Sequence, residues 1–147
     1  MGGIRTIDIG DKAIIARKFK AETLEYEIPL PIVVDKQSVT SATLTTLNGY
    51  AIWKYARWKN ISKVEVELEY ESAGAGDIDL YNITDGSKLA DLVAPSAATS
   101  HTISRIDVTS AITGLSADKT IGIQAAGDGT NAITVYSAKL VVYVKVS

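Results

Sequence analysis

Lys63-Val-Glu-Val-Glu-Leu-Glu-Tyr-Glu71 alternates apolar and acidic side chains without a break, and no other segment of this chain has a stricter pattern. Successive side chains of a β-strand point to opposite faces of a sheet, so the pattern predicts one apolar and one acidic face. One core face and one solvated face are typical of an antiparallel sheet. We therefore expect burial of Val64, Val66, Leu68 and Tyr70, and solvent exposure of Glu65, Glu67, Glu69 and Glu71.

Other strand-like segments follow this one, separated by turns at spacings of roughly 8–12 residues. They cover residues 77–81, 88–93, 102–108, 119–125 and 132–146. The last is the longest, and its apolar parity changes near residues 136–139, which predicts a β-bulge. Because it is apolar enough to serve two neighbours, we expect it in the middle of a sheet.

The first third of the chain is less regular. Strand-like pieces occur at 14–20, 24–28 and 38–47, and Pro29 and Pro31 interrupt the apolar stretch 28–34. Proline cannot donate a hydrogen bond to a sheet, so this stretch is expected to be an edge strand or an arm. The domain prediction is an N-terminal extended segment with the first strands over residues 1–34, which could act as an arm, and a β-sandwich over residues 35–147.

The composition agrees with an all-β chain. Ile, Val and Thr together supply 43 of the 147 residues, and β-branched side chains favour strands. No helical crossover is long enough for a parallel sheet. The predicted fold is an antiparallel β-sandwich, a jelly roll of about eight strands, with an immunoglobulin-like sandwich as the alternative.

Several function classes are excluded or disfavoured by simple counts. The chain has no cysteine, so disulfides and thiolate metal sites are excluded. A net charge of −2 argues against nucleic-acid coating, and no apolar run is long enough to span a membrane. The N-terminus lacks the apolar region of a secretory signal, which predicts synthesis in a host cytoplasm. Scarce Asn, Gln and Met are typical of thermophile proteins.

His101 is the single histidine, and Ser100, Ser104 and Asp107 lie near it in the sequence. A catalytic triad requires the base to lie between nucleophile and orienting acid in space, which local sequence does not show. No Gly-x-Ser-x-Gly motif occurs. We therefore predict a surface histidine and no enzymatic activity.

Acidic and amide side chains recur in or beside the turns of the second half, at Asp77, Asp79, Asp85, Asp128 and Asn131. Such turns bind Ca²⁺ in some sandwich domains, yet Asp-Gly and Gly-Asp-Gly are first of all turn-forming sequences. The chain lacks an EF-hand-like loop with a distant Glu. The prediction is that the chain uses no metal and no cofactor.

Aromatic and basic residues interleave in Tyr50-Ala-Ile-Trp-Lys-Tyr-Ala-Arg-Trp-Lys59. Residues 50–59 could form a strand or one helical stretch, and we favour a strand, which would place Trp53, Tyr55 and Arg57 on one face. Such residues anchor protein interfaces, and they also stack on sugars or bases. With the apolar stretch around the prolines, they form the predicted interface set: Ile28, Leu30, Ile32, Trp53, Tyr55, Arg57 and Trp58.

Ile106-Asp-Val-Thr109 leads into a short helical turn, which Thr109 or Ser110 would cap and Gly114 would end, and Thr120-Ile-Gly-Ile-Gln124 follows. This succession resembles a pattern of jelly-roll modules, among them sugar-binding and cell-surface domains. As a small β-only chain without cysteine, the sequence also resembles single jelly-roll virion proteins. That resemblance implies subunits that assemble into symmetric rings, with extended terminal arms reaching their neighbours.

The predicted function is therefore that of a non-enzymatic, self-assembling virion subunit, whether capsid, penton, decoration or spike. Its partners would be copies of itself and other virion proteins, and the net charge of −2 disfavours nucleic acid as a partner. Residues 1–63 carry ten basic and six acidic side chains (net +4), and residues 64–147 carry five and eleven (net −6), so oppositely charged ends of two subunits could meet. The alternative is a carbohydrate-binding or adhesive module with Trp53, Tyr55 and Trp58 as its stacking platform.

Overall fold

The computed structural model describes residues 24–146, so the strand expected at 14–20 lies outside the described residues. Ten strands, one short α-helix and one 3₁₀ helix account for most of this part of the chain. They are β1 (Leu24–Val33), β2 (Gln37–Val39), β3 (Thr45–Thr46), β4 (Ala51–Trp53), η1 (Tyr55–Arg57), β5 (Ile61–Ser72), β6 (Asp77–Asn82), β7 (Ser87–Val93), β8 (Thr99–Asp107), α2 (Thr109–Thr113), β9 (Lys119–Ala126) and β10 (Ile133–Val146).

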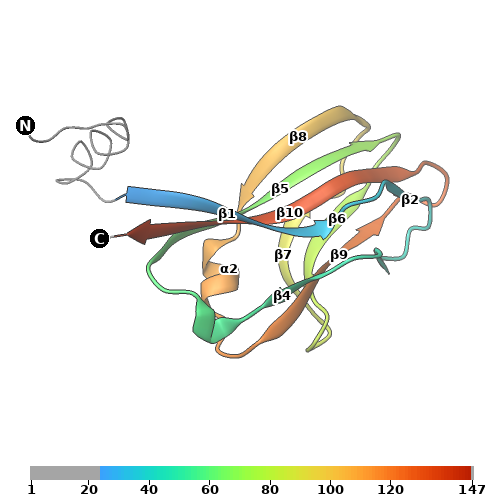
Figure 1. The fold of residues 1–147 in the computed structure, drawn as a ribbon. Coiled ribbons are helices and arrows are strands. Elements are labelled where there is room, and N and C mark those ends of the chain that lie inside the picture. Colours follow the sequence, from blue (N-terminus) through green and yellow to red (C-terminus); the bar gives the residue numbers. More distant parts are fainter. Residues whose placement is uncertain (1–23, 147) are drawn as a thin grey trace, which may run out of the picture.

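The strands form two antiparallel sheets that pack face to face (Figure 1). The first sheet has the order β1-β10-β5-β8, and the second has the order β3-β9-β6-β7. β2 continues the edge position of β1 beside β10, and β4 continues that of β3 beside β9. Ten strands therefore fill eight positions, and the chain crosses between the sheets as in a double Greek key. This confirms the predicted jelly roll over the immunoglobulin-like alternative.

β5 carries the alternation of residues 63–71 as expected. Val64, Val66 and Leu68 are fully buried and Tyr70 is nearly so. They face the apolar side chains of the second sheet, among them Ile78, Leu80, Ile121 and Ile123, in one continuous core. Interdigitation of two such inner faces is the main stabilising contact of a sandwich.

β10 lies between β1 and β5, which confirms its predicted central position. The register with β5 shifts between Val135 and Ser137, so Tyr136 is the extra residue of a β-bulge. The bulge re-aims the side chains that follow, and Leu140 and Val142 join the core that Ile133 and Val135 entered on the other parity.

β1 occupies the edge of the first sheet, where a missing proline N–H does no harm. Its residues pair with β10 from Leu24↔Val146 to Val33↔Ala138, with a register shift between Pro31 and Val33. The edge position predicted for the proline-containing stretch is confirmed. Residues 24–33 are therefore part of the sandwich itself, and the rest of the predicted N-terminal extended segment, residues 1–23, lies outside the described residues.

Three local predictions need correction. Residues 50–59 do not form one strand, because β4 ends at Trp53 and η1 follows at Tyr55–Arg57. Residues 38–47 form only the short pieces β2 and β3. The helical turn ends at Gly114 as expected, but neither Thr109 nor Ser110 is its N-cap, which is Val108. The Thr109 hydroxyl bonds to the backbone of Val64 on β5, and the Asp107 carboxylate accepts the hydrogen bond from the Thr109 N–H. Among the described residues, no helix is long and apolar enough to cross a membrane.

Candidate interaction surface

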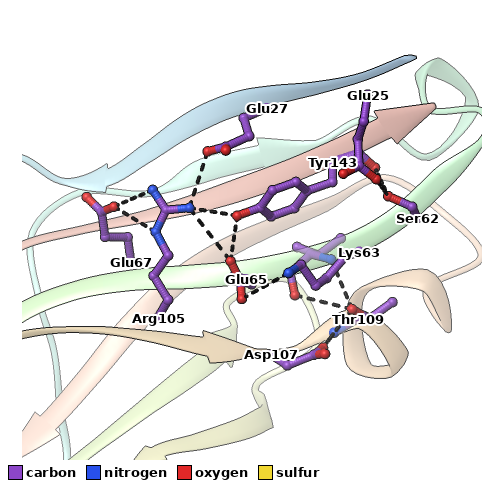
Figure 2. A network of polar contacts seen from close by, with 11 residues as sticks. Glu25, Glu27, Ser62, Lys63, Glu65, Glu67, Arg105, Asp107, Thr109 and Tyr143 are labelled. Carbon is purple, nitrogen blue, oxygen red and sulfur yellow. Dashed lines mark hydrogen bonds and ion pairs between the residues drawn. The ribbon is translucent and has the colours of Figure 1, made fainter. Parts of the chain in front are cut away.

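The outer face of the first sheet carries a network of charged and polar side chains (Figure 2). The alternation of β5 directs Glu65 and Glu67 away from the core, and the neighbouring strands direct side chains of both signs toward them. Cross-strand neighbours of opposite charge stabilise a sheet, and several such pairs on one face form a connected network.

Arg105 on β8 is the centre of this network. Its guanidinium donates two hydrogen bonds to the Glu67 carboxylate, at 3.0 and 2.8 Å. It also donates to Glu27 on β1 at 3.2 Å and to the Tyr143 hydroxyl on β10 at 2.6 Å. A planar guanidinium suits such forked contacts. A single side chain thus connects all four main strands of the sheet.

Each glutamate at the centre of the network has its negative charge balanced by a basic side chain or a hydrogen-bond donor. The Arg105 guanidinium holds the pKa of the Glu67 carboxyl below its usual range, and Lys139 adds to this with its ammonium 3.2 Å away. Glu65 accepts a hydrogen bond of 2.7 Å from Tyr143 and pairs with Lys63 at 3.4 Å. The hydrogen bond to Glu65 raises the pKa of the Tyr143 phenol.

This arrangement corrects the expectation of a freely solvated acidic face. The side chains of Glu65 and Glu67 are 14% and 24% exposed, because Arg105, Tyr143 and Lys139 lie over and between them. The alternation correctly predicted the outer face of β5, but it did not predict which side chains would pair with the glutamates on that face. Chemically, the network neutralises itself and stiffens the sheet.

His101 lies on the same outer face, exposed as predicted. Its Nε2 is 2.6 Å from Glu69, and its ring stacks on Tyr136 with the ring centroids 4.3 Å apart. Ser104 lies opposite the buried Leu68 on the core side of β8, and Asp107 bonds to Thr109. The sequence neighbours therefore do not come together with His101 as a triad.

A second feature, which we call the overhang groove, lies at the end of the sandwich where β10 terminates. β1 and β10 extend there beyond the second sheet (Figure 1), so their inner faces lack the layer that covers them elsewhere. The groove has a volume of about 600 Å³. Its apolar lining is Ile28, Leu30, Trp58, Val144 and Val146, and its polar rim is Arg57, Lys59, Asn60 and Lys145.

The register of β1 and β10 explains why the groove is apolar. Ile28 lies opposite Val142 and Leu30 lies opposite Leu140, both of which are core residues. The same parity continues outward along β10 to Val144 and Val146. Ile28 is 36% exposed and Val146 is 48% exposed, although they belong to the core-facing side of the sheet.

The predicted interface residues separate into three groups. Four of them line the overhang groove, namely Ile28, Leu30, Arg57 and Trp58. Ile32 and Trp53 are core side chains, each 2% exposed, so they support the surface from beneath rather than form it. Tyr55 is exposed and lines a smaller neighbouring cavity of about 230 Å³.

The two tryptophans do not form the flat platform expected for sugar binding. Trp53 stacks on Trp58 with the ring centroids 5.2 Å apart and the planes 9° apart, and the core encloses Trp53. Because η1 interrupts the strand, Tyr55 and Arg57 do not share a strand face with Trp53. Trp53, Tyr55 and Trp58 instead line the cavity of about 230 Å³ together, and because Trp53 is only 2% exposed, Tyr55 and Trp58 are its accessible aromatic side chains.

Several residues that complete these surfaces are not in the predicted interface set. Lys59, Val144 and Val146 line the groove, and Arg105 and Tyr143 organise the network. The alternation of residues 140–146 was a usable signal for the groove, since it continues past the point where the second sheet ends.

The turn aspartates are placed in different surroundings. Asp85 pairs with Lys119 at 2.8 Å, and Asp128 accepts hydrogen bonds from the turn that contains Asn131. Asp77 and Asp79 instead lie close to Asp91, which the sequence did not single out.

No protein-family model and no curated protein matches this sequence. Among solved structures, the fold is similar to the infectious bursal disease virus Gx strain structure, with 15% identity, a TM-score of 0.46 and coverage of 82% of this chain and 32% of the other. It is also similar to the VP2 subviral particle of that virus, with 11% identity, a TM-score of 0.46 and coverage of 82% and 33%. For infectious bursal virus derived T=1 particles, the identity is 13%, the TM-score is 0.43 and the coverage is 86% and 36%. This chain spans about a third of each of those chains.

Proposed function

We propose that this chain is a non-enzymatic structural subunit that associates with copies of itself through the overhang groove. The observation that carries the proposal is the uncovered inner face of β1 and β10. The sequence resemblance to single jelly-roll virion proteins makes a virion the kind of assembly proposed, with the chain as one of its shell or spike subunits.

An uncovered inner face is costly for an isolated subunit. Burial of apolar surface contributes roughly 25 cal/mol per Å², and contiguous exposed apolar patches mark interaction sites in stable proteins. Ile28, Val144 and Val146 continue the core pattern into solvent, so a partner that covers them extends the existing core. Trp58 at the groove is an aromatic anchor of the type that dominates interface energies.

The proposed occupant of the groove is the N-terminal segment of a second copy. Twenty-three residues precede Leu24, and they include the apolar residues Ile4, Ile7, Ile9, Ile14 and Ile15. Residues 12–23 contain no Gly, Pro or Asn, so the sequence offers no turn signal that would reverse the segment onto its own subunit. A fully extended chain of twelve residues is about 40 Å long, which sets the reach proposed for this segment.

The test compares two variants that place a charge at solvent-exposed apolar positions. Ile28→Lys alters the groove, and Ile103→Lys alters an apolar residue on β8 that is 63% exposed and remote from it. We expect the unaltered chain and Ile103→Lys to sediment as multiples of the 15.7 kDa subunit, and Ile28→Lys to shift toward the monomer. A monomeric unaltered chain at tens of micromolar would refute the proposal.

A second measurement tests the role of the N-terminal segment independently of the groove. A chain that starts at Thr23 should keep its circular dichroism spectrum and unfold cooperatively, but it should lose assembly. Addition of a peptide of residues 1–22 should then protect Trp58 from fluorescence quenching in this shortened chain, and not in its Ile28→Lys form. Normal assembly of the shortened chain would show that another surface holds the subunits together.

A salt titration tests whether oppositely charged halves of two subunits meet outside the groove. The groove rim at Arg57, Lys59 and Lys145 is basic, and so is the segment 1–22, with five basic and three acidic residues, so salt should not weaken their contact. Assembly that weakens above physiological ionic strength, where the Debye length is about 8 Å, would show a separate contact between oppositely charged surfaces. Assembly that is the same at low and high salt would assign association to apolar burial alone.

A further inference from the structure

Three aspartates meet on the outer face of the second sheet, at the hairpin of β6 and β7. Asp77 and Asp79 are two residues apart on β6, with the core residue Ile78 between them, so they share the outer face. Asp91 on β7 lies directly opposite Asp79 in the register. One carboxylate oxygen from each of the three lies within 4.8 Å of the other two.

Asp79 makes this cluster unlike an ordinary acidic surface. Its side chain is 1% exposed, and within residues 24–146 its Oδ1 has no hydrogen-bond partner. The Oδ1 of Asp77 is also buried and without a partner in the described part of the chain. A buried carboxylate oxygen without a donor is expensive, and native proteins normally provide such a group with a partner.

One cation of the protein lies nearby, but it does not compensate the cluster. The Lys88 ammonium is 2.5 Å from the Asp91 carboxylate and 4.0 Å from Oδ1 of Asp79. Three carboxylates and one ammonium leave a formal charge of −2. Burial and the charge of Asp77 raise the pKa of the Asp79 carboxyl to about 7, which reflects the same shortage of positive charge.

We propose that Asp77, Asp79 and Asp91 bind a divalent cation that prefers oxygen ligands, with Ca²⁺ as the best match. The donor set contains only carboxylate oxygens, which suit Ca²⁺ rather than the nitrogen- and sulfur-bound transition metals. Ca²⁺ takes six to eight oxygens, so water completes its coordination. Because the Lys88 side chain is half exposed, it can swing away from Asp91 when the ion enters.

A cation site at these aspartates differs from the sequence-based prediction of no metal, and it does not depend on the proposed assembly. The sequence showed Asp77 and Asp79 but gave no reason to join them to Asp91, since strand pairing brings that residue into place. The bound ion would lock β6 to β7 and relieve the burial cost of Asp79.

The experiment uses the full chain, cleared of metal with EDTA, and follows both heat of binding and Tm as CaCl₂ is added. We expect half-saturation at roughly 0.1–1 mM, as in weak extracellular Ca²⁺ sites, and a Tm increase of about 5–9 °C at 10 mM CaCl₂. Asp79→Asn should abolish the heat and the Tm increase. It should also raise Tm in EDTA, because a neutral amide removes the buried charge, so this variant is expected to fold.

Two further variants make the test specific. Asp35→Asn, a substitution of an exposed aspartate outside the cluster, should keep the full response to Ca²⁺. Lys88→Gln should lower Tm in EDTA and increase Ca²⁺ affinity several-fold, because the competing ammonium is gone. The proposal is overturned if 10 mM CaCl₂ changes neither heat nor Tm of the unaltered chain, or if Asp79→Asn responds as Asp35→Asn does.

Discussion

The Arg105 guanidinium on β8 reaches across β5 and donates a hydrogen bond of 2.6 Å to the Tyr143 hydroxyl on β10. That hydroxyl in turn donates to Glu65 on β5, which lies between the two strands. The phenol is thus both acceptor and donor in a chain of contacts that crosses the first sheet. Figure 2 shows how it occupies the middle of the network.

Tyr143→Phe is expected to lower the free energy of unfolding by about 1 kcal/mol, because Arg105 loses an acceptor and Glu65 loses a donor. Urea denaturation measures the change. Tyr55→Phe, on a tyrosine that is 51% exposed, is the control and should leave stability unchanged. Equal effects of the two substitutions would mean that the network adds nothing to stability.

Val66→Asp tests the register of β5. Val66 is fully buried between the sheets, so its replacement introduces an unpaired charge into the core at a cost of roughly 3–5 kcal/mol. Ile103→Lys on the neighbouring strand β8 places a charge at a side chain that is 63% exposed and opposite Glu69, so it should cost little. Thermal unfolding of both variants measures the difference, and a Val66→Asp protein of normal stability would contradict the assigned core face.

Gly49 is a position where only glycine fits. Its φ of +110° is in the left-handed region, and a Cβ there would collide with the carbonyl oxygen of Ile32. Gly86 has a φ of +68°, but the nearest atom to an added Cβ is the Tyr81 hydroxyl at 3.6 Å. Gly86→Ala should therefore cost only the backbone term of about 1–2 kcal/mol, and Gly49→Ala should cost more. Equilibrium unfolding of both variants ranks them, and the reverse order would contradict this view of the β1–β4 contact.

Asp128 gives the protein an acid-sensitive contribution to stability. Hydrogen bonds from the Asn131 side chain and from backbone N–H groups lower the pKa of the Asp128 carboxyl from 3.8 to about 2. The folded state then binds fewer protons than the unfolded state between these values. This contribution is complete above pH 4 and is lost as pH falls toward 2. Asp128→Asn should flatten that part of a Tm–pH profile, whereas Asp35→Asn should not.

The fold class could be derived from the sequence because period-two alternation is a local property. Residues 63–71 contain their own inner and outer faces, the prolines at 29 and 31 exclude a central position for their strand, and the parity change near Tyr136 marks the bulge of β10. Each of these signals depends on backbone geometry over a few residues, which does not change with the rest of the fold.

The partners of individual side chains depend on contacts between residues far apart in the chain. Arg105 and Glu27 are separated by 78 residues, and β1, β5, β8 and β10 must all be in register before the two side chains meet. Likewise, Trp53 is in the core rather than on a platform because η1 turns the chain after β4. The overhang groove exists because β1 and β10 extend beyond the second sheet. Asp91 lies beside Asp77 and Asp79 only because β6 pairs with β7. Alternation specifies which way a side chain points, but strand length and register in three dimensions decide what it meets.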